Sequence, residues 1–296
     1  MKLLALLLLF PFLCIAQSSI TQEDRQKANS FYVASDWSNA ITAYKKIAEA
    51  EPQNWNARTR LGVSYLSSGN SKEAVKYLEE AVKIGNNNLS MYYLGSAFAM
   101  TKQPDQAFQW IEKSIKNGFA QISVFDEDKN LMALKSDSRF SKYRDEILKT
   151  VYPCRYSEKS RAFDFWIGEW DVKNVQGLPA GKSKIEVMLG DCVLLENWTS
   201  APPNAYAGKS FNLFNSASQK WIQTWVDDKG GLIEFINGEY KDNKMEFVTH
   251  PDAKNLITRL TLYNLGPDRV RQHFETTSDD GKTWTTTTDL NYFRIK

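Results

Sequence analysis

Apolar residues recur along the first half of the chain at a spacing of 34 and then 33 residues. A period of this length is typical of short structural units that stack, each burying its apolar face against the next. It predicts an α-solenoid of three units, at about 21–54, 55–87 and 88–121. Four sets of residues share both spacings: Ala28, Gly62 and Gly95; Phe31, Tyr65 and Phe98; Ala40, Ala74 and Ala107; Tyr44, Leu78 and Ile111.

The period resembles the tetratricopeptide repeat, a helix-turn-helix unit of about 34 residues. The resemblance implies that residues 17–121 form three helix pairs, in which the small residues let the paired helices approach closely. Pro52 is expected to end one helix and Pro104 to begin another, because proline fits a first helical turn but not a helix interior. Residues 122–150 keep a helical spacing and resemble the segment that often closes such arrays, so we expect a helical cap there.

The concave surface of such a solenoid is a common site for peptides and protein partners. One known subclass of the family grips a C-terminal carboxylate with Lys, Arg and Asn from the first helices. Arg25 and Asn29 lie at two such positions, but Thr59 and Val63 stand at the matching positions of the second repeat. We therefore predict a mixed polar and aromatic groove for a protein or peptide partner. Its candidate contacts, which could instead pack between helices, are Arg25, Asn29, Tyr32, Tyr92 and Met100.

The pattern changes after residue 160, where apolar and polar residues begin to alternate. Residues 151–160 are polar, contain Pro153 and lack a period, which predicts a linker. Short strands joined by tight turns, with no helix between them, indicate an antiparallel up-and-down barrel or a sandwich. We predict a barrel of about ten strands over residues 161–296, so the fold class is α then β in two domains. The candidate strands are 163–174, 182–189, 192–199, 207–214, 220–227, 231–239, 243–249, 256–263, 268–277 and 284–294.

The stretch from Phe163 to Val172 predicts a buried opening strand, with Trp166, Gly168 and Trp170 on one face. Gly168 between two tryptophans indicates a bend or a close approach of the backbone. With the turn at 189–192, the Gln-Thr-Trp at 223–225 and the Asp-Gly-Lys-Thr-Trp at 280–284, this stretch resembles an uncharacterised exported bacterial domain of the lipocalin-like barrel type. That resemblance implies a fold and export, but no established activity.

A barrel of about ten strands can be filled by side chains or can enclose one small molecule. One alternating set of residues mixes polar with aromatic side chains, which suits an amphipathic ligand. We therefore predict that the barrel holds a small apolar ligand in its interior or provides a second contact surface. The alternation could also run the other way and leave Arg271 and Glu275 in solvent. The candidate interior residues are Trp170, Glu196, Trp198, Gln223, Trp225 and His273.

His273 also permits a narrower hypothesis, because haem-binding barrels of a related kind use a single histidine on a late strand as axial ligand. A lone histidine on a strand is more often a surface residue or a satisfied core residue. We therefore expect no cofactor and no metal.

Enzyme motifs are missing from the sequence, which has no G-x-S-x-G elbow, no H-E-x-x-H and no phosphate-binding loop. We expect a non-enzymatic binding or scaffold protein. The alternative is a hydrolase for carbohydrate or lipid at the barrel mouth, with Glu196 and Glu275 as candidate acids. A formal net charge of +2 is too small for a nucleic-acid partner.

The first residues indicate export. Residues 1–16 have a positive start, a short apolar run and small residues at the end, as in a secretory signal peptide. No later apolar run is long enough to span a membrane. A lipid anchor at Cys14 is the alternative, which the large residues before it disfavour. We expect a periplasmic or secreted protein with a Cys154–Cys192 disulfide, the alternative being two buried free thiols.

Overall fold

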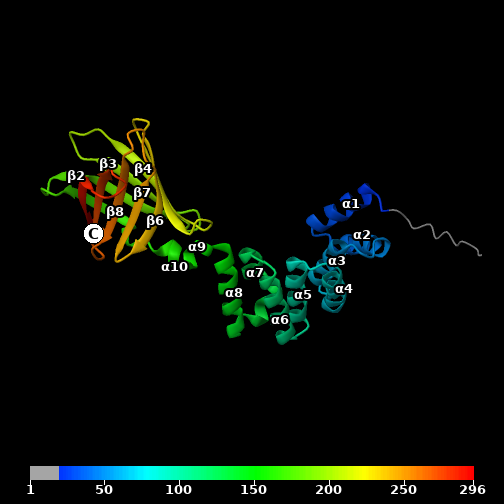
Figure 1. The fold of residues 1–296 in the computed structure, drawn as a ribbon. Coiled ribbons are helices and arrows are strands. Elements are labelled where there is room, and N and C mark those ends of the chain that lie inside the picture. The colour runs from blue at the N-terminus through cyan, green and yellow to red at the C-terminus, as the bar shows by residue number, and fades with distance from the viewer. Residues whose placement is uncertain (1–19) are drawn as a thin grey trace, which may run out of the picture. The chain divides into compact units, whose positions relative to one another are not determined.

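The computed structural model describes residues 20–296, and the chain divides into two compact units that meet between Val151 and Tyr152 (Figure 1). The expected signal peptide at residues 1–16, with Cys14, lies outside the described residues. Within residues 20–296, no helix combines the length and the apolar character that crossing a membrane requires.

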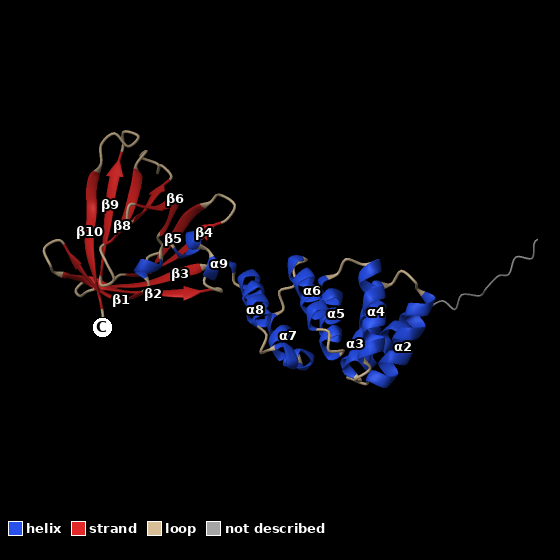
Figure 2. Ribbon diagram, turned by 90° about the horizontal axis from the view of Figure 1, so that it is seen from below, coloured by secondary structure: helices blue, strands red, loops and turns tan. Residues whose placement is uncertain are grey.

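The first unit begins with six helices in three helix-turn-helix pairs, which confirms the predicted helical repeat (Figure 2). Small residues hold each pair together. A Cβ on Gly62 would lie 2.5 Å from Cγ of Leu78, and a Cβ on Gly95 would lie 2.8 Å from the carbonyl oxygen of Ala107. The pairs are α1 (Gln22–Val33) with α2 (Trp37–Ala50), α3 (Trp55–Ser67) with α4 (Ser71–Ile84), and α5 (Asn88–Met100) with α6 (Pro104–Lys116).

Three further segments cover the last helix pair: α7 (Ile122–Glu127), the 3₁₀ helix η1 (Lys129–Leu134) and α8 (Ser138–Val151). Phe125, Leu131 and Ile147 point into the core that these segments share with α5 and α6, and each is 0% exposed. Such burial is what the end of a solenoid needs, since its last repeat otherwise leaves an apolar face in water.

The second unit is a closed antiparallel barrel in which every strand pairs with its neighbours in sequence and β1 pairs with β10. This topology confirms the up-and-down barrel and rules out a sandwich, because closure leaves no sheet edge. The strands are β1 (Gly168–Asn174), β2 (Pro179–Met188), β3 (Val193–Ser200), β4 (Ala207–Asn215), β5 (Lys220–Asp227), β6 (Leu232–Lys241), β7 (Lys244–Thr249), β8 (Ile257–Asn264), β9 (Arg269–Thr277) and β10 (Thr285–Arg294).

The opening strand is shorter than the sequence predicts, because residues 164–166 form a 3₁₀ helix, η2 (Asp164–Trp166). The rings of Phe163 and Trp166 stack at 5.1 Å between centroids and are both fully buried. Alternation alone cannot separate this arrangement from a strand, since large apolar residues fit both. Gly168 makes the predicted bend, with φ of 136°, and its backbone lies against the guanidinium of Arg294.

The expected linker at 151–160 contains two short helices, α9 (Pro153–Tyr156) and α10 (Glu158–Arg161), which belong to the barrel unit. Cys154 forms the predicted disulfide with Cys192, in the turn between β2 and β3. Arg155 adds an ion pair of 2.7 Å with Asp191 in the same turn. These contacts order a segment whose sequence carries no periodic signal.

Candidate ligand cavity and peptide groove

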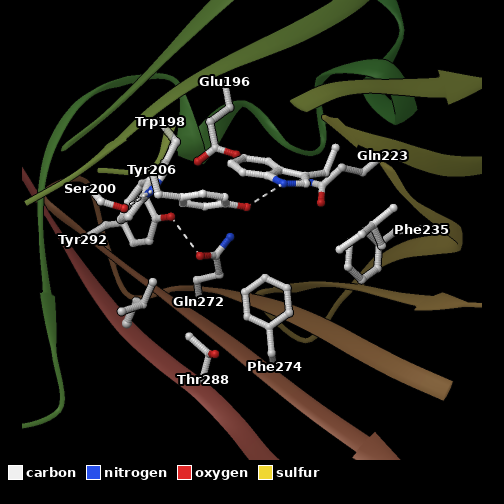
Figure 3. A pocket seen from close by; sticks show the side chains of 13 residues that line it. Glu196, Trp198, Ser200, Tyr206, Gln223, Phe235, Gln272, Phe274, Thr288 and Tyr292 are labelled. Atoms are coloured by element: carbon white, nitrogen blue, oxygen red, sulfur yellow. Dashed lines mark hydrogen bonds between the residues drawn. The ribbon is translucent and has the colours of Figure 1, made fainter. Parts of the chain in front are cut away.

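The barrel contains a cavity of about 340 Å³ (Figure 3). Strands β3, β5, β6, β9 and β10 and the loop before β4 contribute its walls. The lining side chains are Glu196, Trp198, Ser200, Tyr206, Gln223, Trp225, Ile233, Phe235, Gln272, Phe274, Thr288, Leu290 and Tyr292.

Away from the cavity, aromatic side chains pack together in the core of the barrel. Phe163 packs edge-on against Trp221 at 5.6 Å and lies 5.9 Å from Phe247, and all three are buried. Trp170 belongs to this packed end: its Nε1 donates to the carbonyl oxygen of Trp166 at 2.9 Å. Its assignment as a ligand contact is therefore wrong, although the prediction of an interior position is right.

Glu196 forms the polar floor of the cavity. Its carboxylate accepts hydrogen bonds from the hydroxyls of Ser183, at 2.8 Å, and Ser210, at 2.9 Å. Burial disfavours the charged form and raises the pKa of Glu196 to about 7. The nearby hydroxyl of Tyr292 also has a pKa raised by burial. The floor of the cavity thus holds a carboxyl group that changes charge near neutral pH.

Two glutamine amides face the cavity from opposite walls (Figure 3). Gln223 donates through Nε2 to Oδ1 of Asn212 at 2.6 Å, and Gln272 accepts through Oε1 from the hydroxyl of Tyr292 at 2.8 Å. Oε1 of Gln223 and Nε2 of Gln272 have no hydrogen-bond partner among the residues that the structure describes. The cavity therefore offers one free acceptor and one free donor in addition to the carboxyl group of Glu196.

The upper walls are aromatic. Trp225 donates through Nε1 to the hydroxyl of Tyr206 at 3.1 Å, which fixes both rings at the mouth. Glycines make the space for the indoles: any Cβ on Gly208 would collide with the ring of Trp225, and one on Gly181 would lie 2.7 Å from Cζ2 of Trp198. Glu196, Trp198, Gln223 and Trp225 thus come together around one cavity.

His273 lies on the outer face of the barrel wall, which corrects its assignment to the interior. The antiparallel register pairs it with Thr261 and Asp289, whereas its neighbour Gln272 pairs with the interior residues Leu262 and Leu290. Its Nε2 contacts the hydroxyl of Thr286 at 3.0 Å. The imidazole therefore cannot serve as an axial ligand for a haem held inside the barrel.

The alternation of β9 runs in the second of the two directions that the sequence allowed. Glu275 pairs with Arg259 at 2.6 Å and Arg271 pairs with Asp289 at 2.7 Å, both outside the wall. Sequence analysis consequently missed Gln272 and Phe274, which face the cavity. Gln272 and Phe274 alternate along β9 as interior residues do. The sequence prediction instead placed the other alternating set, which contains His273, in the interior.

The helical unit has a separate hollow of about 200 Å³ on its first two repeats. Arg25 and Asn29, two of the candidate contacts, line it together with Arg60 from α3. Arg60 donates to Oδ1 of Asn29 at 2.8 Å and lies over the ring of Tyr32 at 4.8 Å. Arg25 is paired with Glu51. Arg60 was not predicted, because the positions in the second repeat that match Arg25 and Asn29 are Thr59 and Val63.

Two other predicted groove contacts differ from each other. Tyr92 is 0% exposed, stacks on Phe119 at 4.4 Å and donates to Oδ2 of Asp128 at 3.0 Å. It is a core residue, and its assignment as a partner contact is wrong. Met100 is 44% exposed at the end of α5 and stays a candidate contact.

Part of the first unit matches a known repeat family. Residues 25–89 match the tetratricopeptide repeat family. The match runs from α1 to the start of α5, and the pair α5–α6 repeats the same small-residue packing at Gly95 and Ala107. No curated protein sequence matches the chain.

Solved structures resemble part of the chain at low identity. MamA from Desulfovibrio magneticus RS-1 is 17% identical, covering 45% of this chain and 76% of its own length, with a TM-score of 0.38. The TPR2B domain of yeast Sti1, in complex with pHsp70, is 14% identical over 43% of this chain and 94% of its own, with a TM-score of 0.33. The second TPR domain of human RPAP3, in complex with an HSP70 peptide, is 15% identical over 42% and 91%, with a TM-score of 0.32.

Proposed function

We propose that this is an exported, non-enzymatic binding protein. Its tetratricopeptide repeats hold a protein or peptide partner, and its barrel holds a small amphipathic ligand. The Cys154–Cys192 disulfide supports export, because such bonds persist in oxidising compartments.

The cavity is the main support for ligand binding by the barrel. Its volume of about 340 Å³ falls at the lower end of the range for small-molecule sites. Aromatic walls with a few converging polar groups are the usual composition of such sites. The amide atoms of Gln223 and Gln272 that make no hydrogen bond within the protein add to this, because they line the cavity and can bond to a ligand.

Native mass spectrometry of the full chain, purified from an exporting host, tests whether the cavity is occupied. We expect a non-covalent mass excess that disappears on denaturation. Ile233→Trp, which fills the mouth, should remove the excess. Leu232→Trp is the matched control, because the adjacent Leu232 is 63% exposed and is not a lining residue. An excess that survives Ile233→Trp would place the bound molecule elsewhere.

Arg60 is the main support for peptide binding at the hollow of the helical unit. It has no carboxylate partner among the described residues, whereas Arg25 is paired with Glu51. Its guanidinium lies over the rings of Tyr32 and Tyr44 and donates to the amide of Asn29, so its charge suits a carboxylate of a bound peptide.

A display screen of peptides with free C-termini, using the full chain as bait, tests the groove. We expect Arg60→Ala to weaken the enriched peptides by about tenfold or more, as loss of a charge-assisted hydrogen bond would. Lys72→Ala, which removes a cation at the start of α4, is the control and should change little. Equal effects of the two substitutions would contradict a role for the hollow.

The hydrolase alternative named two acids, Glu196 and Glu275. The first faces the cavity and the second is paired with Arg259 on the outer face of the wall. A single substrate cannot contact both, so this carboxylate pair gives no support to a hydrolase.

A further inference from the structure

We propose that the ligand of the barrel cavity is a small organic cation, with an ammonium group bound at Glu196 between the aromatic walls. This inference rests on the proposed ligand-carrying function and specifies its chemical class.

The charge of the cavity favours a cation. Of the lining residues that the structure describes, none is Lys, Arg or His, and Glu196 is the one carboxyl group. An anionic ligand such as a fatty acid would meet no cation in the lining to compensate its charge. A cationic ligand can pair with the ionised form of Glu196, and buried charges are tolerated only when paired.

Glu196 retains part of its hydrogen-bonding capacity. Each of its two oxygens accepts one serine hydroxyl, from Ser183 and Ser210, and the hydroxyl of Tyr292 lies within hydrogen-bonding reach of the same group. An ionised carboxylate can accept about four hydrogen bonds, so about one position remains. Glu196 is also a lining residue, so this position is within reach of a ligand. An N–H group of an ammonium ligand can donate to it.

The walls are aromatic. Trp198, Tyr206 and Tyr292 lie around the space next to Glu196 (Figure 3), and Trp225 also lines the cavity. The faces of such rings carry partial negative charge and attract cations that lie within about 6 Å. The same rings provide apolar surface for the rest of the ligand. An amine on an aromatic or alkyl body therefore fits both the carboxyl group of Glu196 and the aromatic walls.

Binding of a cation also changes the protonation state of Glu196. Ser183 on β2, Ser210 on β4 and Tyr292 on β10 face Glu196, and none of them is charged. In the empty cavity Glu196 is therefore largely protonated below pH about 7. An ammonium group favours the carboxylate, so its binding releases the proton of Glu196 to solvent.

Calorimetric titration of the full chain with three matched probes tests the inference: tryptamine, tryptophol and indoleacetate, which are a cation, a neutral alcohol and an anion. At about pH 8 we expect tryptamine to bind about tenfold or more tightly than tryptophol, and indoleacetate to bind least. Glu196→Gln should remove the advantage of tryptamine over tryptophol. Glu186→Gln, on the outer face of β2, should leave both affinities unchanged.

Proton release provides a second readout. Titrations at about pH 6, in two buffers with different ionisation enthalpies, should report release with tryptamine but not with tryptophol, and none in Glu196→Gln. If tryptophol binds and tryptamine gains nothing over it, the cationic class is wrong while the carrier function stands. If none of the three probes binds to the native chain, the carrier function and the cationic class both fall.

Discussion

Glu196 is held in the barrel wall by two serine hydroxyls, with no cation beside it. Its pKa rises from the ordinary value of 4.5 to about 7, because burial penalises the carboxylate. The folded barrel therefore binds a proton that the unfolded chain releases between these two pH values. Stability from this group is complete below about pH 4.5 and is lost as the pH rises through about 7.

We expect Glu196→Gln to remove this loss. Relative to the native chain, the variant should gain about 3 kcal/mol in the free energy of unfolding of the barrel between pH 4 and pH 8. Urea unfolding followed by pulsed amide exchange on peptides from β2–β4 measures it. A constant difference between variant and native chain across this range would contradict a buried, protonated Glu196.

Trp166 and Trp170 provide a matched comparison, because both side chains are fully buried in the packed end of the barrel. Nε1 of Trp170 donates to the carbonyl oxygen of Trp166, whereas Nε1 of Trp166 is buried without a partner among the described residues. We expect Trp170→Phe to cost about 1–3 kcal/mol more than Trp166→Phe, since only the first leaves a carbonyl unsatisfied. Barrel-resolved urea unfolding compares the two; equal costs would contradict the assigned bond.

Among the elements, α9 and α10 depend most on tertiary contacts. Each has four residues, far fewer than an isolated helix needs. The disulfide and the Arg155–Asp191 ion pair fix them to the turn between β2 and β3.

Replacing Cys154 and Cys192 together by Ser should destabilise the barrel by about 2–4 kcal/mol, because the bond closes a loop across 38 positions of sequence. Amide exchange should increase first in residues 153–161, while the helices of the first unit keep their protection. Faster exchange confined to α1–α6 would be inconsistent with this role.

Strand β9 illustrates how far sequence analysis reaches at this scale. Its alternation predicted a strand at the right position, but both of its faces contain polar residues. Gln272, and not His273, faces the interior, because Gln272 pairs with the interior residues Leu262 and Leu290 of the two neighbouring strands. A period of two gives the two faces of a strand and cannot say which one is buried.

At the scale of the whole molecule, the disulfide connects the fold to the compartment in which it forms. We expect the native chain, produced in an exporting bacterial host, to contain no thiol that reacts after denaturation at Cys154 or Cys192. Deletion of residues 2–16 should keep the protein in the reducing cytosol and make both thiols reactive. Thiol labelling with mass detection distinguishes the two preparations. Labelling of the native chain would contradict export or disulfide formation.

Local sequence alone determined the architecture: a period near 34 residues gave the helical repeats, and alternation between turns gave ten strands within a few residues, except at η2. Both signals are short-range, because each element must bury one face of its own. The sites depended on tertiary structure. Tyr92 is buried by Phe119 and Asp128, and Arg60 reaches Asn29 from another helix. Burial and charge pairing are set by residues distant in sequence, so only the folded chain decides which side chains a ligand or partner can touch.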